Sequence, residues 1–259
     1  MDFLNPNAPH ASAAQEAATR PLAAGSYPPD SLEAVRNYAS GLMAVTNELV
    51  AAALQAIPSA TRNIDLLERR RHAIAEATRE TCSRDGFNAT SVGDIAKLAG
   101  IDKRTLYDYV GTKEDTLFLV FLSTLPRQMR RLVAVFDEGG SAQDVLRGLA
   151  HEHILYISED PGLVLLSYRE MRYLTRPQIE SLLAIIENIV KLFEGVIAWG
   201  VAEGTIRSGN PRVCAHALRT MLDIRGLSGW DLRRFTVDEV EAAVTSMVFD
   251  GLFLTEPAP

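Results

Sequence analysis

The chain has few cysteines, and it lacks an uninterrupted apolar run long enough to span a membrane. Only Cys82 and Cys214 occur among its 259 residues, and neither lies in a Cys-x-x-Cys or Cys/His cluster. A disulfide framework and a zinc site are therefore not expected, and both thiols are predicted to be reduced. The most apolar long stretch, 181–204, has charged or amide side chains at positions 187, 188, 191 and 194, so no membrane span is predicted.

Excess positive charge and catalytic motifs are missing as well. The formal net charge is −7, which excludes a protein that coats nucleic acid through bulk positive charge. The sequence contains no Gly-rich phosphate loop, metal-ligand cluster or nucleophile elbow, so no enzyme, no cofactor and no metal site is predicted. No early Lys or Arg precedes an apolar run, so no signal peptide is predicted and a cytoplasmic protein is expected.

The first 60 residues divide into a tail and an amphipathic segment. Residues 1–30 are rich in Ala, Pro, Asn and Ser, a composition that predicts a flexible tail. From 31 to 57 apolar residues recur three and four apart, which predicts an N-terminal extension helix that ends at Pro58. This helix is expected to pack on its own body or on a second subunit, and a dedicated partner-recruiting helix is the alternative.

Beyond Pro58 the sequence shows repeated helix start and stop signals, and it lacks the alternation of apolar and polar residues that is typical of a strand. An all-α fold is therefore predicted. Hydroxyl residues followed three positions later by an acid or amide mark several helix starts, and glycines mark stops. The expected helices are 64–84, 92–98, 103–110, 113–136, 142–158, 161–174, 176–203, 211–227 and 237–254.

The segment from Asn88 to Lys113 has the spacing of a helix-turn-helix. Small and apolar residues give helix 92–98 a buried face, and Gly100 supplies a turn position that tolerates positive φ. Asp102 is expected to cap a second helix that begins with Lys103 and Arg104. In helix-turn-helix proteins the N-terminal residues of this second helix reach base edges in the major groove. The predicted DNA contacts are Thr90, Ser91, Lys103, Arg104, Thr105, Tyr107, Tyr109 and Lys113.

This region resembles the DNA-binding domain of the TetR family of transcriptional regulators over about 50 residues. Val110 replaces the family's usual Phe, and Thr81 and Cys82 occupy positions that usually carry Leu and Phe. The motifs that match in register are Ile74, Ala77, Gly86-Phe87, Ala89-Thr90-Ser91, Asp94-Ile95-Ala96, Ala99-Gly100, Thr105-Leu106-Tyr107 and Lys113-Glu114.

The resemblance implies a three-helix helix-turn-helix domain at 61–112 and a helical ligand-binding and dimerisation domain at 113–259. It also implies a homodimer, paired through helices 211–227 and 237–254, on a double-stranded palindromic operator. Residues 61–115 contain ten Lys or Arg and ten Asp or Glu, so DNA binding is expected to depend on which face carries the cations.

An effector pocket is expected among helices 142–203. Aromatic and His residues on core-facing helices more often serve packing and internal hydrogen bonds, and that alternative stays open. The candidates are His151, His153, Tyr156, Tyr168, Arg169, Tyr173 and Trp199.

The interpretation is a repressor released from its operator by a small apolar effector. The C-terminal half faintly resembles family members that regulate lipid or acyl-thioester catabolism, through Ile197, Gly200, Gly204, Thr205-Ile206-Arg207, Pro211, Trp230 and Phe249-Asp250-Gly251-Leu252. The alternative is a constitutive DNA-binding protein that recruits a partner through helix 31–57.

Overall fold

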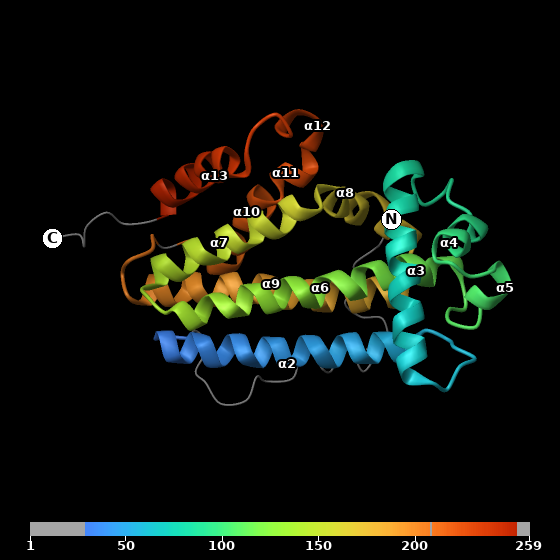
Figure 1. The fold of residues 1–259 in the computed structure, drawn as a ribbon. Helices are drawn as coiled ribbons and strands as arrows, with labels where there is room; N and C mark the ends of the chain where they lie inside the picture. The colour runs from blue at the N-terminus through green and yellow to red at the C-terminus, as the bar shows by residue number, and fades with distance from the viewer. Residues whose placement is uncertain (1–28, 208, 253–259) are drawn as a thin grey trace.

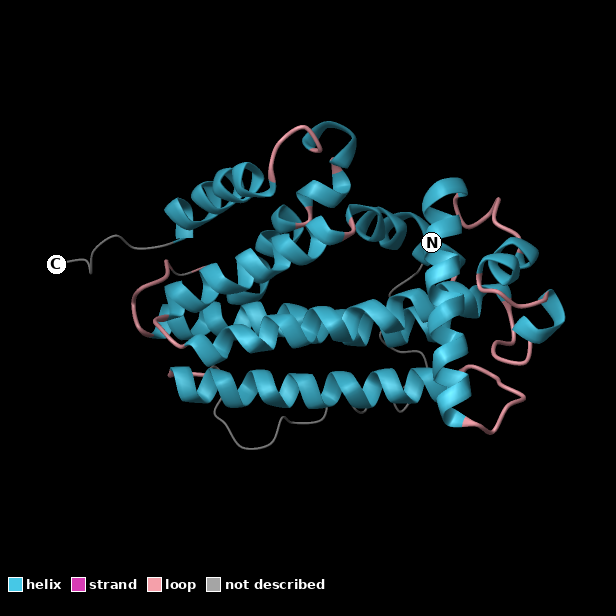
Figure 2. Cartoon of the chain, in the orientation of Figure 1, coloured by secondary structure: helices cyan, strands magenta, loops and turns pink. Residues whose placement is uncertain are grey.

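The computed structural model describes residues 29–207 and 209–252, and these residues form helices joined by loops (Figure 2). The all-α prediction is therefore confirmed. The tail predicted at 1–30 lies outside the described residues except for Pro29 and Asp30, as does the last part of helix 237–254. Among the described residues, no helix is long and apolar enough to cross a membrane.

The observed helices follow the predicted ones closely over most of the chain. Four differences occur: the second helix of the helix-turn-helix is shorter, the predicted helix 161–174 ends as a 3-10 turn from Met171, helix 211–227 is broken at Asp223, and one short helix was not predicted. The elements are α2 (Leu32–Ala56), α3 (Ile64–Asp85), α4 (Val92–Leu98), α5 (Lys103–Leu106), α6 (Lys113–Glu138), α7 (Ala142–Glu159), α8 (Pro161–Glu170), the 3-10 turn η1 (Met171–Tyr173), α9 (Arg176–Ala202), α10 (Pro211–Leu222), α11 (Ile224–Leu227), α12 (Gly229–Leu232) and α13 (Val237–Leu252).

The extension helix α2 packs along its own body, beside α6 and α9 (Figure 1). Its apolar stripe is buried, and two polar contacts fix its register. The Asn188 amide donates to the Thr46 hydroxyl at 3.1 Å, and the Arg36 guanidinium donates to the Phe136 carbonyl at 2.6 Å and 3.1 Å. The structure thus shows this helix packed on its own body, one of the two arrangements expected for a packing helix.

The helix-turn-helix region, formed by α3, α4 and α5 and called the head below, has no hydrophobic core of its own. Its buried residues Ile74, Ile95 and Leu106 belong to the same cluster as Leu117 and Phe121 of α6. The ends of α2, α8 and α9 contribute to this cluster too. A second cluster fills the rest of the body and joins α2, α6, α7, α9, α10 and α13. The head is therefore packed as an extension of the body.

One buried cation connects the head to α2. The Arg71 side chain is 7% exposed and donates hydrogen bonds to the carbonyls of Tyr109 (3.0 Å), Leu54 (2.8 Å), Ile57 (2.7 Å) and Pro58 (3.4 Å). The carbonyl of Leu54 lies in the last turn of α2 and those of Ile57 and Pro58 directly follow the helix, where helical carbonyls lack intrahelical partners and the helix dipole favours a cation. Arg71 thus binds the end of α2 and the end of the reading segment together.

Replacing Arg71 by Ala is expected to lower the free energy of unfolding by about 3 kcal/mol, because buried carbonyls lose their donor. The measurement is urea denaturation followed by circular dichroism. Arg62→Ala, at an exposed position just before α3, is the matched control and should change stability by less than about 0.5 kcal/mol. Equal denaturation midpoints for the two variants would contradict the role given to Arg71.

Candidate nucleic-acid interface and effector cavity

The turn between α4 and α5 is built by local capping and one glycine. The Ser91 hydroxyl accepts a hydrogen bond from the Asp94 amide, and the Asp94 carboxylate accepts from the Ser91 amide, which closes a capping box at the start of α4. Gly100 has a φ of +70°, a conformation that L side chains rarely adopt. Asp102 then caps α5 by accepting from the Thr105 amide at 2.9 Å. These bonds set the angle at which α5 leaves the turn.

The exposed surface of α5 is small and carries two cations. Lys103 and Arg104 are exposed, and Tyr107, just beyond the helix, is 43% exposed. Thr105 is half-buried and its hydroxyl donates to Asp102 at 2.6 Å, a bond that lowers the pKa of that carboxyl below its ordinary value. The side chains free to meet DNA at this helix are therefore Lys103, Arg104 and Tyr107.

Two of the predicted DNA contacts are buried, contrary to the prediction. Thr90 is 3% exposed and its hydroxyl donates to the Gly86 carbonyl at 2.9 Å. Tyr109 is 7% exposed because α5 ends at Leu106, and the turn that follows carries Tyr109 into the core. The predicted continuation of the helix to residue 110 was wrong for the same reason.

Ser91 and Lys113, two further predicted DNA contacts, already make contacts within the protein. Ser91 is exposed, but its amide and hydroxyl are both bonded to Asp94, at 3.1 Å and 2.5 Å. Lys113 is half-buried, donates to the Phe87 carbonyl at 2.5 Å and lies 4.2 Å from the centre of the Phe87 ring. A phosphate at either position would have to compete with these contacts.

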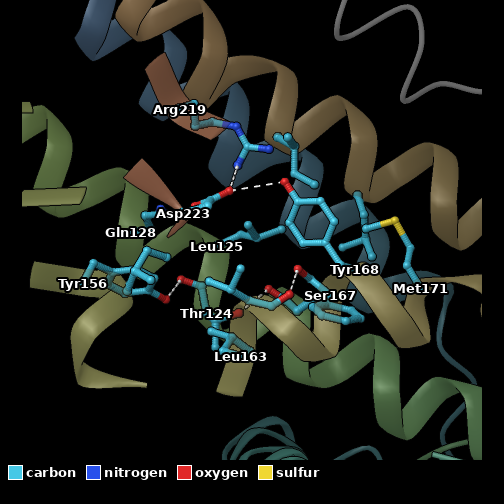
Figure 3. Close-up of a pocket in the computed structure, with 15 residues that line it drawn as sticks. Thr124, Leu125, Gln128, Tyr156, Leu163, Ser167, Tyr168, Met171, Arg219 and Asp223 are labelled. Carbon is cyan, nitrogen blue, oxygen red and sulfur yellow. Dashed lines mark hydrogen bonds and ion pairs between the residues drawn. The ribbon is translucent and has the colours of Figure 1, made fainter. Parts of the chain in front are cut away.

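The body contains a cavity of about 80 Å³ between α6, α7, α8, α9 and the junction of α10 and α11 (Figure 3). One side of its lining is apolar and deeply buried, with Phe121 and Leu182 at 3% and 0% exposure. Helix α11 packs closely against α8 beside the cavity, and this approach depends on Gly226, where an added Cβ would lie 2.5 Å from Val164.

The other side of the cavity is polar, and its centre is the carboxylate of Asp223. This residue is 3% exposed and interacts with His153 Nε2 at 2.9 Å, the Tyr168 hydroxyl at 3.5 Å and Arg219 at 3.6 Å. Gln128 contacts the other ring nitrogen of His153 at 3.3 Å. Burial, together with the negative charge of Asp223, raises the pKa of the Tyr168 hydroxyl. Tyr168 therefore remains a neutral donor beside that carboxylate.

Two of the predicted effector contacts, Tyr156 and Tyr168, line this cavity. Burial raises the pKa of Tyr156 to about 12, and its hydroxyl donates to the Thr124 carbonyl at 2.8 Å. His153 lies behind the cavity wall, where it is fully buried. The remaining candidates do not line the cavity: His151 pairs with Glu241, Trp199 donates to Glu203, Tyr173 packs on the Phe87 ring, and Arg169 is exposed.

Sequence reasoning missed Gln128, Arg219 and Asp223 as cavity residues. Arg219 and Asp223 lie on the segment predicted as an unbroken dimerisation helix, so their place beside α8 was not expected. The one available signal was Asp223 itself, an acid directly between the apolar residues Leu222 and Ile224.

A short cationic helix presented by a helix-turn-helix, on an all-helical body, defines a DNA-binding transcriptional regulator. Residues 74–119 match the family model of bacterial regulatory proteins of the tetR family, and residues 139–252 match that of the tetracyclin repressor-like C-terminal domain. The chain belongs to the TetR family.

Several relatives and solved structures resemble the chain. The fatty acid metabolism regulator protein of Bacillus subtilis (strain 168) is 24% identical over 136 residues, which are 52% of this chain and 70% of that protein. The structure of FadR from Bacillus subtilis in complex with stearoyl-CoA has a TM-score of 0.62 at 20% identity and covers 70% of this chain and 98% of its own. The structure of AibR in complex with isovaleryl coenzyme A and operator DNA has a TM-score of 0.63 at 21% identity and covers 71% of this chain and 100% of its own.

Replacing Arg104 or Tyr107 by Ala is expected to weaken binding to a selected operator by about tenfold or more, because a base or phosphate contact is lost. The operator is recovered by selecting bound sequences from random DNA, and affinity is measured by fluorescence anisotropy. Arg130→Ala, at an exposed position of α6, is the control. Unchanged specific binding by both head variants would overturn the assignment of α5 as the reading helix.

Proposed function

We propose that the chain is a cytoplasmic repressor that binds a palindromic operator as a homodimer and is released when an acyl thioester of coenzyme A enters the cavity. The names of the similar proteins support the effector class. The observation that carries the proposal is that two helices of the cavity wall, α6 and α8, also contact the head.

Helix α6 begins at the head and reaches the cavity two to three turns later. The carboxylate of Asp115 in its first turn accepts hydrogen bonds from the amides of Gly111 (3.0 Å) and Thr112 (2.9 Å), which end the head. Pro126 lies within α6 beside cavity residue Leu125. Because proline has no amide hydrogen, the helix lacks one backbone bond there and can bend. A ligand in the cavity would press on α6 at this point.

Helix α8 contacts the head at both of its ends. Asp160, which precedes its first residue, pairs with Arg79 of α3 at 2.8 Å. Just beyond its last residue, the Tyr173 ring lies 5.3 Å from the Phe87 ring. Leu163 and Tyr168, between these ends, line the cavity. Displacement of α8 would therefore be passed to α3.

The small size of the cavity supports a movement of its lining helices when a ligand enters. Its volume of about 80 Å³ is well below the roughly 300–1,000 Å³ typical of ligand pockets. An acyl chain can enter only if α6, α8 or α11 moves outward. The ligand would then favour a conformation of the head other than the one described, which is the requirement for an effector that changes DNA affinity.

Exposed apolar side chains on α10 and α13 support a dimer. Val213 is 63% exposed and Met247 is 73% exposed, although both lie on helices whose other faces are buried. Pairing of these faces across a two-fold axis would bury them and place two reading helices about 34–36 Å apart. The recruiting role considered for α2 has no such support, because its apolar stripe is already covered by α6 and α9.

The proposal is tested by titrating the protein–operator complex with saturated acyl-CoA thioesters of four to eighteen carbons. At least one chain length is expected to lower operator affinity by about fivefold or more, within the usual range of allosteric coupling. Free coenzyme A is the control and should have no effect, since it carries no acyl chain. Operator affinity that is unchanged by every thioester would contradict the proposal.

A further inference from the structure

One donor at the polar side of the cavity has no partner. The Nε–H of Arg219 is buried and makes no hydrogen bond, although Arg219 lines the cavity. A buried donor without an acceptor costs about 1–3 kcal/mol and is uncommon in folded proteins. Elsewhere on the same side, the hydroxyls of Tyr156 and Ser167 already donate to backbone carbonyls. A hydrogen-bond acceptor of a ligand would therefore contribute most to the binding free energy if it lay next to Arg219 Nε.

The charge at this position is already balanced. The guanidinium of Arg219 lies 3.6 Å from the Asp223 carboxylate. His153 Nε2 lies 2.9 Å from the same carboxylate, and Gln128 contacts His153 Nδ1 at 3.3 Å. The positive charge of Arg219 is matched by the carboxylate of Asp223. A ligand carboxylate would add an uncompensated negative charge close to a buried acid, which is costly.

Two side chains of the polar side, those of Tyr168 and Arg219, reach solvent. Tyr168 is 54% exposed, and the Arg219 side chain is 22% exposed, whereas Phe121 and Leu182 are buried. An apolar chain would thus lie deep in the cavity and its polar group near the mouth.

We propose that Arg219 and Asp223 select effectors that carry a neutral carbonyl group, a thioester or ketone, and reject the free carboxylate of the same chain length. This inference rests on the proposed function, because it concerns the same cavity. Arg219 Nε–H donates to the carbonyl oxygen, and the carboxylate of Asp223 repels an anionic head group.

The test compares octanoyl-CoA, 2-octanone and octanoate by isothermal titration calorimetry at pH 8, where octanoate is ionised. The full chain is expected to bind 2-octanone at least tenfold more tightly than octanoate, which is a difference in binding free energy of about 1.4 kcal/mol. Octanoyl-CoA and 2-octanone both carry a carbonyl group, one as a thioester and one as a ketone. If both bind more tightly than octanoate by the same factor, the protein recognises the carbonyl alone. If octanoyl-CoA binds more tightly than 2-octanone, the coenzyme makes additional contacts.

Two variants assign the discrimination to named groups. Asp223→Asn leaves the positive charge of Arg219 unmatched, so octanoate affinity is expected to rise about tenfold while 2-octanone affinity changes little. Arg219→Lys keeps the charge but lacks the Nε–H, so 2-octanone affinity is expected to fall about tenfold. Arg233→Lys, at an exposed position after α12, is the control.

The outcomes distinguish this inference from the proposed function. Equal affinity for ketone and carboxylate, or wild-type behaviour of both variants, overturns the inference even if octanoyl-CoA still releases the operator. Failure of all three probes to bind overturns the inference and also counts against the cavity as an effector site.

Discussion

The structure depends on the hydrophobic cluster that the head shares with the body. Helix α5 has four residues, far too few to be stable alone, so its position is set by the packing of Leu106 and Val110 against their neighbours. The same cluster contains Leu117 and Phe121 of α6, and Phe121 also lines the cavity. The cavity and the helix that carries Lys103 and Arg104 therefore share one packed cluster.

Two sets of polar contacts join the head to different helices of the body. Arg71 binds the end of α2 to the end of the reading segment, while Arg79 and Asp160 bind α3 to the start of α8. The first contact joins the head to a helix that stays packed along the body, and the second joins it to a wall of the cavity. In the proposed function, the second contact is the one through which a ligand in the cavity would act on DNA affinity.

The helices were predictable from the sequence because their signals are local. The Ser91-Asp94 capping box and Pro161 mark starts that need no tertiary information. The end of α5 was not predictable, because the apolar spacing continues to Val110 while the backbone turns after Leu106. The cavity was mostly missed because Gln128 and Asp223 are far apart in sequence and meet only through packing. Aromatic candidates such as Tyr173 and Trp199 matched the pattern of a pocket but serve internal contacts instead.

In the proposed function, contact between α8 and α3 couples ligand binding in the cavity to DNA binding. This coupling is tested most directly by measuring operator affinity with and without saturating octanoyl-CoA in Arg79→Ala, with Arg84→Ala as a control whose ion pair stays within the head, to Asp85. Arg79→Ala is expected to bind the operator but to lose most of the change in operator affinity that octanoyl-CoA causes in the control, because this contact carries the coupling free energy. An undiminished response in Arg79→Ala would contradict this coupling.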